Sequence, residues 1–133
     1  MYEMFKTTLT FNDEQKVKLK AYIRKEFCLK ENIMDSEISL YLKAIILKLT
    51  GDVDFIAELK EVEDRIKNNK NVGDEFVLNE LFTDKEWESK KFFKMILGRM
   101  FYNKCQDKEY RENVGIIENG KNVRNVQQYK KIR

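Results

Sequence analysis

Apolar and polar residues alternate at the start of the chain. Over residues 5–11 one face carries Phe5, Thr7, Leu9 and Phe11, and the other carries Lys6, Thr8 and Thr10. A period of two with β-branched and aromatic residues is typical of a half-buried strand. Asn12 follows as a helix N-cap, with Gln15 at capping-box spacing. The pattern predicts a strand that runs directly into a helix.

Three helical stripes come next. The first contains Leu19, Ile23 and Phe27, with Val17 and Tyr22 at its sides. Residues 38–49, capped by Asp35 or Ser36 and ended by Gly51, are apolar over most of the helix circumference. The third stripe consists of Phe55, Leu59, Val62 and Ile66, and a polar linker follows over residues 67–71. We therefore expect one region over residues 1–67 and a second domain over residues 72–133.

The second half of the chain mixes short strands and helices. Residues 75–78 predict a strand, and Thr83 and Glu86 have capping-box spacing. A helix over about residues 89–104 would bury Phe93, Ile96, Leu97, Met100 and Phe101, and would leave Lys90, Lys91, Lys94, Arg99, Asn103 and Lys104 outside. Asn119-Gly120 between two β-leaning runs predicts a hairpin turn. The expected fold class is α+β, mainly helical, with an N-terminal strand.

Composition excludes several chemistries. The 133 residues contain no histidine, no proline, five scattered glycines and two distant cysteines, Cys28 and Cys105. Histidine-based catalysis, cysteine-rich metal sites and glycine-rich phosphate loops are therefore absent from the sequence. We predict no catalytic residues, no metal and no cofactor. An enzyme that uses carboxylates, such as a Mg²⁺-dependent nuclease, would need acids at a diagnostic spacing, which Glu75, Glu80, Glu86 and Glu88 do not show.

Charge is distributed unevenly. The chain has a net charge of +3, but residues 117–133 carry five basic side chains against one acid, whereas residues 52–71 carry four against six. A basic end after an acidic middle is compatible with an anionic partner and equally with a solvated surface rich in lysine. No apolar run is long enough to cross a membrane, and we expect a cytoplasmic protein without membrane contact.

The first region resembles the ribbon-helix-helix family of DNA-binding proteins. The resemblance rests on Thr8-Leu9-Thr10-Phe11-Asn12-Asp13-Glu14, an alternating strand followed by a capped, acidic first turn. It implies a homodimer whose paired strands enter the major groove. Lys6, Thr8 and Thr10 would then contact base edges, and the start of the second helix near Ser36 and Glu37 would meet phosphate.

The second region resembles a small uncharacterised domain found in short proteins of Gram-positive bacteria, their phages and their plasmids. Four strings carry this resemblance over residues 72–133: residues 73–82 (GDEFVLNELF), residues 86–87 (EW), residues 97–101 (LGRMF) and residues 129–132 (YKKI). The family indicates a biological context and supplies no mechanism.

The order of elements in this second region also resembles a winged helix. In that architecture the helix over residues 89–104 would lie in the major groove, and the hairpin would flank it as a wing. On this resemblance the helix would contact DNA through Lys90, Lys91, Lys94 and Arg99, and the wing through Lys121, Asn122, Arg124, Lys130 and Lys131.

The sequence therefore predicts a small protein that binds double-stranded DNA, acting as a transcriptional repressor or accessory regulator of a mobile element. The alternative is an inhibitor encoded by a phage or plasmid, similar to anti-CRISPR proteins, that binds a host protein which handles nucleic acids. In that case the acids of residues 52–64 would mimic phosphates: Asp52, Asp54, Glu58, Glu61, Glu63 and Asp64.

Overall fold

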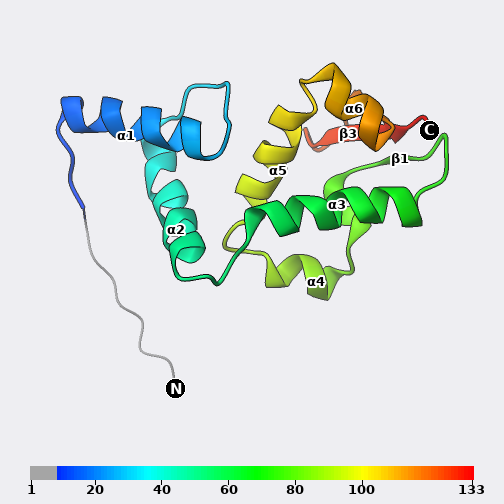
Figure 1. Ribbon diagram of the computed structural model, residues 1–133, viewed down its shortest axis with the longest axis horizontal. Helices are drawn as coiled ribbons and strands as arrows, with labels where there is room; N and C mark the ends of the chain where they lie inside the picture. Colours follow the sequence, from blue (N-terminus) through cyan, green and yellow to red (C-terminus); the bar gives the residue numbers. More distant parts are fainter. Residues whose placement is uncertain (1–8) are drawn as a thin grey trace.

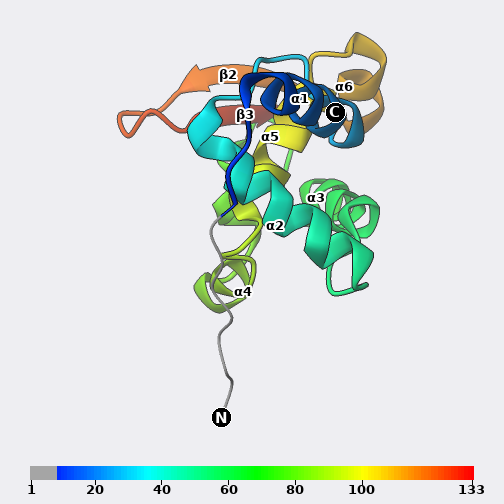
Figure 2. The same ribbon diagram turned by 90° about the vertical axis from the view of Figure 1, so that its left-hand side faces the viewer.

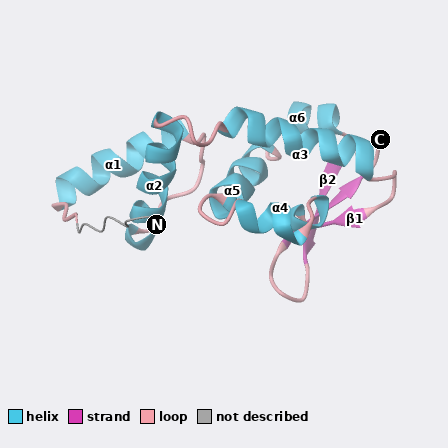
Figure 3. Cartoon of the chain, turned by 90° about the horizontal axis from the view of Figure 1, so that it is seen from below, coloured by secondary structure: helices cyan, strands magenta, loops and turns pink. Residues whose placement is uncertain are grey.

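The computed structural model describes residues 9–133 and is a mainly helical α+β fold, as predicted (Figure 1, Figure 3). Its helices are α1 (Asp13–Glu26), α2 (Ile38–Leu49), α3 (Phe55–Asn69), α4 (Asp84–Ser89), α5 (Lys94–Lys104) and α6 (Lys108–Val114). Its strands are β1 (Glu75–Phe76), β2 (Ile116–Lys121) and β3 (Gln127–Lys131). Two short 3-10 turns, η1 (Asp35–Glu37) and η2 (Leu78–Leu81), complete the described elements.

Helix α1 begins as its capping signal predicts. The Asn12 side chain accepts a hydrogen bond from the Gln15 backbone N–H at 2.8 Å, and the Gln15 side chain accepts one from the Asn12 N–H at 3.0 Å. Ile23 and Phe27 are buried, whereas Val17 and Tyr22 remain exposed, so the apolar stripe is narrower than predicted. Residues 5–8 of the predicted strand lie outside the described residues, and residues 9–12 have no strand structure.

The start of α2 differs from the prediction. Neither Asp35 nor Ser36 caps it, because both lie inside the turn η1, where the Glu37 carboxylate accepts a hydrogen bond from the Met34 backbone N–H at 3.0 Å. Asp35 instead forms ion pairs with Lys16 and Lys20 of α1. The carboxylate thus joins two helices. Gly51, with φ of +79°, ends the helix as expected.

Helix α3 confirms the third stripe and extends further than predicted. Phe55, Leu59, Val62 and Ile66 are all buried, and Asp54 caps the helix by accepting from the Ile56 and Ala57 N–H groups. The helix continues to Asn69 and therefore includes most of the predicted linker. It packs against η2, α5 and α6, so in space it lies with the second half of the chain (Figure 1).

The sheet has the order β1-β3-β2 with antiparallel pairs, which confirms the hairpin. The predicted turn is wrong. Asn119 and Gly120 lie within β2 at a register irregularity, where Gly120 has φ of +70°. Residues 122–126 form the actual connection. The Asn122 carboxamide oxygen accepts the Arg124 and Val126 backbone N–H groups at 2.9 and 3.0 Å, and these bonds fix the loop.

Helix α6 was not predicted. Asp107 caps it and Gly115 ends it with φ of +82°, but within its seven residues only Tyr110 and Val114 pack against the core. So short a segment shows no apolar stripe. A Cβ at Gly115 would lie 3.1 Å from Arg133, which is a second reason for glycine there.

One hydrophobic core joins the two halves. Phe27 of α1 packs edge-on against Phe55 of α3 at 5.4 Å between ring centroids, and Phe55 packs in the same way against Phe93 at 5.9 Å. Phe27 also packs against Tyr41 of α2 at 5.5 Å, so both helices share this core, although they lie to one side of the molecule (Figure 1).

Candidate nucleic-acid interface

A groove of about 780 Å³ lies between the outer face of α5 and the β2–β3 loop. We call it the α5–loop groove. Trp87 and five residues of α5 line one side, and the β2–β3 loop with the strand ends that flank it lines the other: Trp87, Lys94, Met95, Gly98, Arg99, Tyr102, and then Lys121, Asn125, Val126 and Gln127. The loop projects from the body of the molecule (Figure 2). The two elements that the winged-helix resemblance named therefore do meet around one hollow.

The apolar face of α5 determines which residues line the groove. Ile96, Leu97, Met100 and Phe101 are buried, as predicted. The opposite stripe, at i, i+4 and i+8, is Lys94, Gly98 and Tyr102, and it forms the floor. A Cβ at Gly98 would meet only Leu78 Cδ1, at 3.9 Å. Packing therefore does not require glycine at this position, which deepens the floor by a methyl group.

Aromatic rings form part of the groove wall. Trp87 stacks on Phe82 with ring centroids 5.5 Å apart and an interplanar angle of 28°, and the Trp87 side chain also lines the groove. Tyr102 is partly exposed, and Met95 is 55% exposed. Trp87 is partly buried and packs against the hydrophobic core as well. The i, i+4, i+8 stripe of α5 was the signal that could have identified Tyr102.

The lysines of the groove are unpaired within the described part of the chain. Lys94 lines the groove from α5 and Lys121 from the end of β2, and neither forms an ion pair with any of residues 9–133. Arg124, at the loop tip, and Lys91, before α5, are exposed and equally unpaired over the same residues. Glu31 is the acid among the lining residues. The electrostatic character of the groove is therefore basic.

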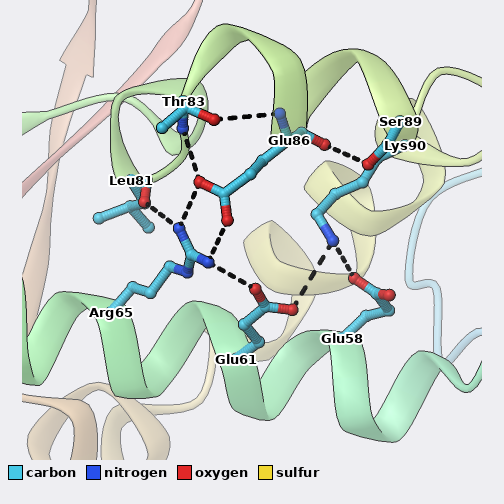
Figure 4. Close-up of polar contacts among 8 residues, drawn as sticks. All are labelled: Glu58, Glu61, Arg65, Leu81, Thr83, Glu86, Ser89 and Lys90. Carbon is cyan, nitrogen blue, oxygen red and sulfur yellow. Dashed lines mark hydrogen bonds and ion pairs between the residues drawn. The ribbon is translucent and has the colours of Figure 1, made fainter.

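Lys90 contradicts its predicted exposure. It is 7% exposed, and its Nζ lies 2.6 Å from Glu58 Oε2 and 3.7 Å from Glu61 Oε2 on α3 (Figure 4). The ammonium also lies over the Phe82 and Phe93 rings, 5.1 and 5.8 Å from their centroids. The helix predicted from Ser89 begins only at Lys94, and the intervening turn directs Lys90 toward α3. Lys90 is a structural residue.

Arg65 closes the same network from the other side. Its guanidinium donates to Glu86 at 3.0 Å, to the Leu81 carbonyl at 3.1 Å, and pairs with Glu61 at 3.0 Å (Figure 4). The Arg65 hydrogen bonds, followed by the Thr83 backbone N–H, lower the pKa of Glu86 to about 2. Arg65 and Lys90 both lie over Phe82, on which Trp87 stacks. The network therefore positions one wall of the groove.

Arg99 contacts protein, in contrast to its predicted role. It pairs with Glu37 and donates to the Tyr41 hydroxyl at 3.0 Å. Asn103, also predicted to be outside, is buried, and its side chain accepts from the Lys30 N–H at 3.0 Å. One edge of α5 thus attaches the segment over residues 30–41 to the second half of the chain. A hydrogen-bonded, half-buried guanidinium is a poor candidate for phosphate contact.

Lys131 is a further correction. It is 8% exposed, and its Nζ donates to the carbonyls of Ile66, Lys67 and Lys70 at 3.2, 3.0 and 2.6 Å. These carbonyls belong to the end of α3, where backbone acceptors lack helical partners and a cation is favoured. Lys131 caps the end of α3, so its ammonium group is not available to contact a ligand.

The remaining predicted contacts divide three ways. Lys6 and Thr8 lie outside the described residues, and Thr10 is exposed in a segment without regular structure. Lys130 is half-buried in β3, opposite Glu75 and Ile117. Asn122 holds the loop with its side-chain oxygen. Among the acids of residues 52–64 that were predicted to mimic phosphates, Glu58 and Glu61 form ion pairs within the protein.

Comparison with known proteins defines the class of this chain. The model of the family described as domain of unknown function DUF1413 matches residues 60–131. The chain belongs to this family, which confirms the predicted uncharacterised domain and places its start inside α3, earlier than residue 72. No curated protein and no solved structure matches. The matched segment contains the whole α5–loop groove apart from Glu31.

Residues 9–133 contain no helix with the length and apolarity needed to span a bilayer. Nor do His, Cys, Asp and Glu side chains gather in threes or more as a metal site would require within these residues.

Proposed function

We propose that the protein binds nucleic acid through the outer face of α5 and the β2–β3 loop. The observation that supports this most directly is the position of Lys94 and Lys121. They come from segments far apart in sequence, line the same groove, and form no ion pair with residues 9–133. Unpaired cations around a concave surface attract a polyanion and accelerate its encounter with the protein.

The winged-helix order favours duplex DNA as one form of nucleic acid that this surface would contact, through its phosphates. Lys91 and Lys94 would contact phosphates from the start of α5, and Lys121 and Arg124 would contact them from the loop. Lysine suits this role because a compact charge needs little orientation toward phosphate. The proposed biological role is a repressor or accessory regulator of a mobile element, without a catalytic step or cofactor.

We also propose that the protein acts as a homodimer through α1 and α2. Support comes from apolar side chains that the fold leaves exposed on these helices: Val17 at 68%, Ile46 at 58% and Leu49 at 79%. Exposed apolar surface on these two helices favours association with a second copy of the chain. Light scattering after size-exclusion chromatography would give twice the monomer mass, and Ile46→Glu with Leu49→Glu would return it to the monomer. A monomeric native protein at micromolar concentration would exclude this part of the proposal.

The main experiment is a titration with labelled duplex DNA at several salt concentrations. We expect binding that weakens as salt increases, with a slope that falls by about 2 in the variant Lys94→Ala/Lys121→Ala, because each lost phosphate contact removes nearly one unit. A matched control is Lys60→Ala/Lys67→Ala, which removes the same charge from exposed positions of α3. Failure to bind duplex or single-stranded DNA at any salt, or equal losses in the two variants, would contradict the proposal.

A second candidate function is binding to a host protein that handles nucleic acids. Exposed apolar residues beside the groove favour it: Phe92 is 59% exposed and Val123 at the loop tip is fully exposed. Such side chains can anchor a protein interface. Co-purification of the tagged protein with one defined host nuclease, abolished by Phe92→Ser but not by Lys94→Ala, would favour this function over DNA binding.

A further inference from the structure

We infer that the α5–loop groove holds unpaired nucleotides, so that its preferred ligand is single-stranded nucleic acid. This inference rests on the proposed function, since it specifies which part of a nucleic acid occupies the same site. The cations at the rim would contact the backbone of either form. Only bases that are free of a partner strand could reach the floor.

The shape of the groove supports this choice. A helix that enters the major groove, which is about 12 Å wide, must protrude from its protein. Here the outer stripe of α5, Lys94, Gly98 and Tyr102, is the floor of a hollow, and the β2–β3 loop stands beside it. The volume of about 780 Å³ is within the range of small-molecule sites. It suits a few bases, whereas a paired duplex would stay at the rim.

The aromatic residues supply surfaces for stacking. Trp87 stacks on Phe82, and the cationic groups of Arg65 and Lys90 lie over the Phe82 ring. Trp87 also lines the groove. Tyr102 borders it from α5. Stacking on aromatic side chains is the common means by which proteins bind single strands with little sequence preference, and it is combined with a basic groove. The α5–loop groove has both features.

Polar groups of the groove are suited to base edges. Asn79, Asn125 and Gln127 line it. The Gln127 side-chain nitrogen donates to the Gly120 and Gln128 carbonyls at 2.9 and 3.0 Å, which orients its oxygen as the remaining acceptor. Carboxamides can hydrogen-bond with unpaired bases on edges that a duplex conceals.

Charge distinguishes this occupant from a neutral one. Lys94 and Lys121 line the hollow from α5 and from β2 without acidic partners among the described residues, and Glu31 is the acid that lines it. In a single-stranded nucleic acid, the phosphates would contact the lysines of the groove, and the bases would stack on its aromatic side chains. An acidic peptide would match the walls alone, and the experiment separates these ligands.

The test uses the fluorescence of Trp87, the single tryptophan of the chain. The probes are an oligothymidylate of about 12 nucleotides, a blunt duplex of equal length and polyglutamate, each added to the full chain at low salt. We expect the oligothymidylate to quench Trp87 and to bind about tenfold more tightly than the duplex, whereas polyglutamate leaves the emission unchanged.

Two tyrosine variants sharpen the test. Tyr102→Ala should weaken oligothymidylate binding about tenfold and leave duplex binding unchanged, because it removes one stacking surface and no charge. Tyr22→Ala is the matched control, since Tyr22 is 53% exposed on α1, away from the groove. Circular dichroism verifies that both variants are folded.

Each outcome decides between the alternatives. Equal affinity for single strand and duplex without quenching of Trp87 overturns the inference and leaves the proposed function in place. Equal loss in the Tyr102 and Tyr22 variants also overturns it. Quenching by polyglutamate as strong as that by the oligothymidylate assigns the groove to an acidic protein segment. Absence of salt-dependent binding to either nucleic acid contradicts the proposed function itself.

Discussion

Two neighbouring sets of basic residues have opposite roles in this molecule. Between α3 and α4, Lys90 and Arg65 are paired with Glu58, Glu61 and Glu86 (Figure 4). Across the α5–loop groove, Lys94 and Lys121 have no acidic partner within residues 9–133. Lys90 and Lys94 are only four residues apart in sequence. The difference shows that the charge of a lysine says little about its role until its direction is known.

Burial explains why the two sets differ. A lysine taken out of water must be paired, because an isolated buried ammonium is very costly. Lys90, at the end of α4, faces the acids of α3, and its pairing permits burial against Phe82 and Phe93. Lys94 begins α5 after the chain has turned, and it keeps contact with solvent. The following predictions test this contrast.

The largest expected effect is the loss of the buried ammonium. Lys90→Ala should lower the free energy of unfolding by about 3 kcal/mol, because it leaves Glu58 in a mostly buried site without its partner. Urea denaturation followed by circular dichroism measures the change. The double variant Lys90→Met/Glu58→Leu should recover most of the loss, since it removes both charges. A loss below about 0.5 kcal/mol in Lys90→Ala would show that the pair is open to solvent.

The next effect concerns the cap of α3. Lys131→Ala should lower the free energy of unfolding by about 2 kcal/mol, because it removes three charge-assisted hydrogen bonds to the carbonyls at the end of α3. Lys130→Ala is the matched control, since that neighbouring residue is half-buried and donates none of these bonds. Equal losses in the two variants would contradict the capping role.

The third prediction concerns pH. The hydrogen bonds from Arg65 keep the pKa of Glu86 at about 2, below its ordinary value of 4.5. A lowered folded-state pKa stabilises the protein above pH 4.5, and this contribution disappears as the pH falls from 4.5 to 2. Glu86→Gln should therefore be less stable at neutral pH and show a flatter loss of stability in this range. Thermal melts from pH 7 to pH 2 measure both, and parallel curves for the two proteins would contradict the pairing.

Much of the fold could be predicted from the sequence, because capping signals and apolar stripes are local. Asn12 with Gln15, Thr83 with Glu86 and the stripe from Phe55 to Ile66 all form as expected. The hairpin turn could not be placed correctly, since Asn119-Gly120 and Asn122 to Val126 both carry turn residues. Tertiary contacts with β3 decided between them.

The candidate site was harder to predict. Lys90 and Arg99 were expected outside on helical periodicity, and Lys131 was named by the winged-helix resemblance. Neither argument says anything about acids or carbonyls that arrive from distant segments. Lys94 and Lys121 were identified because their own elements turn them outward. Trp87 packs against the core and also lines the groove beside α5, and only the spatial arrangement reveals the second contact.

The smallest expected effect is a gain in stability, whereas the effects above are losses. Lys94 occupies the first position of α5, where the helix dipole disfavours a cation, and no side chain caps this terminus. Lys94→Ala should therefore raise the free energy of unfolding by about 0.3 kcal/mol at low salt, and salt should diminish this gain. Urea denaturation at two ionic strengths measures it, with Lys67→Ala on α3 as the control. A loss above about 1 kcal/mol would mean that Lys94 has a structural partner. A gain in stability together with weaker DNA binding would indicate that this lysine is retained for its ligand, at a small cost to the fold.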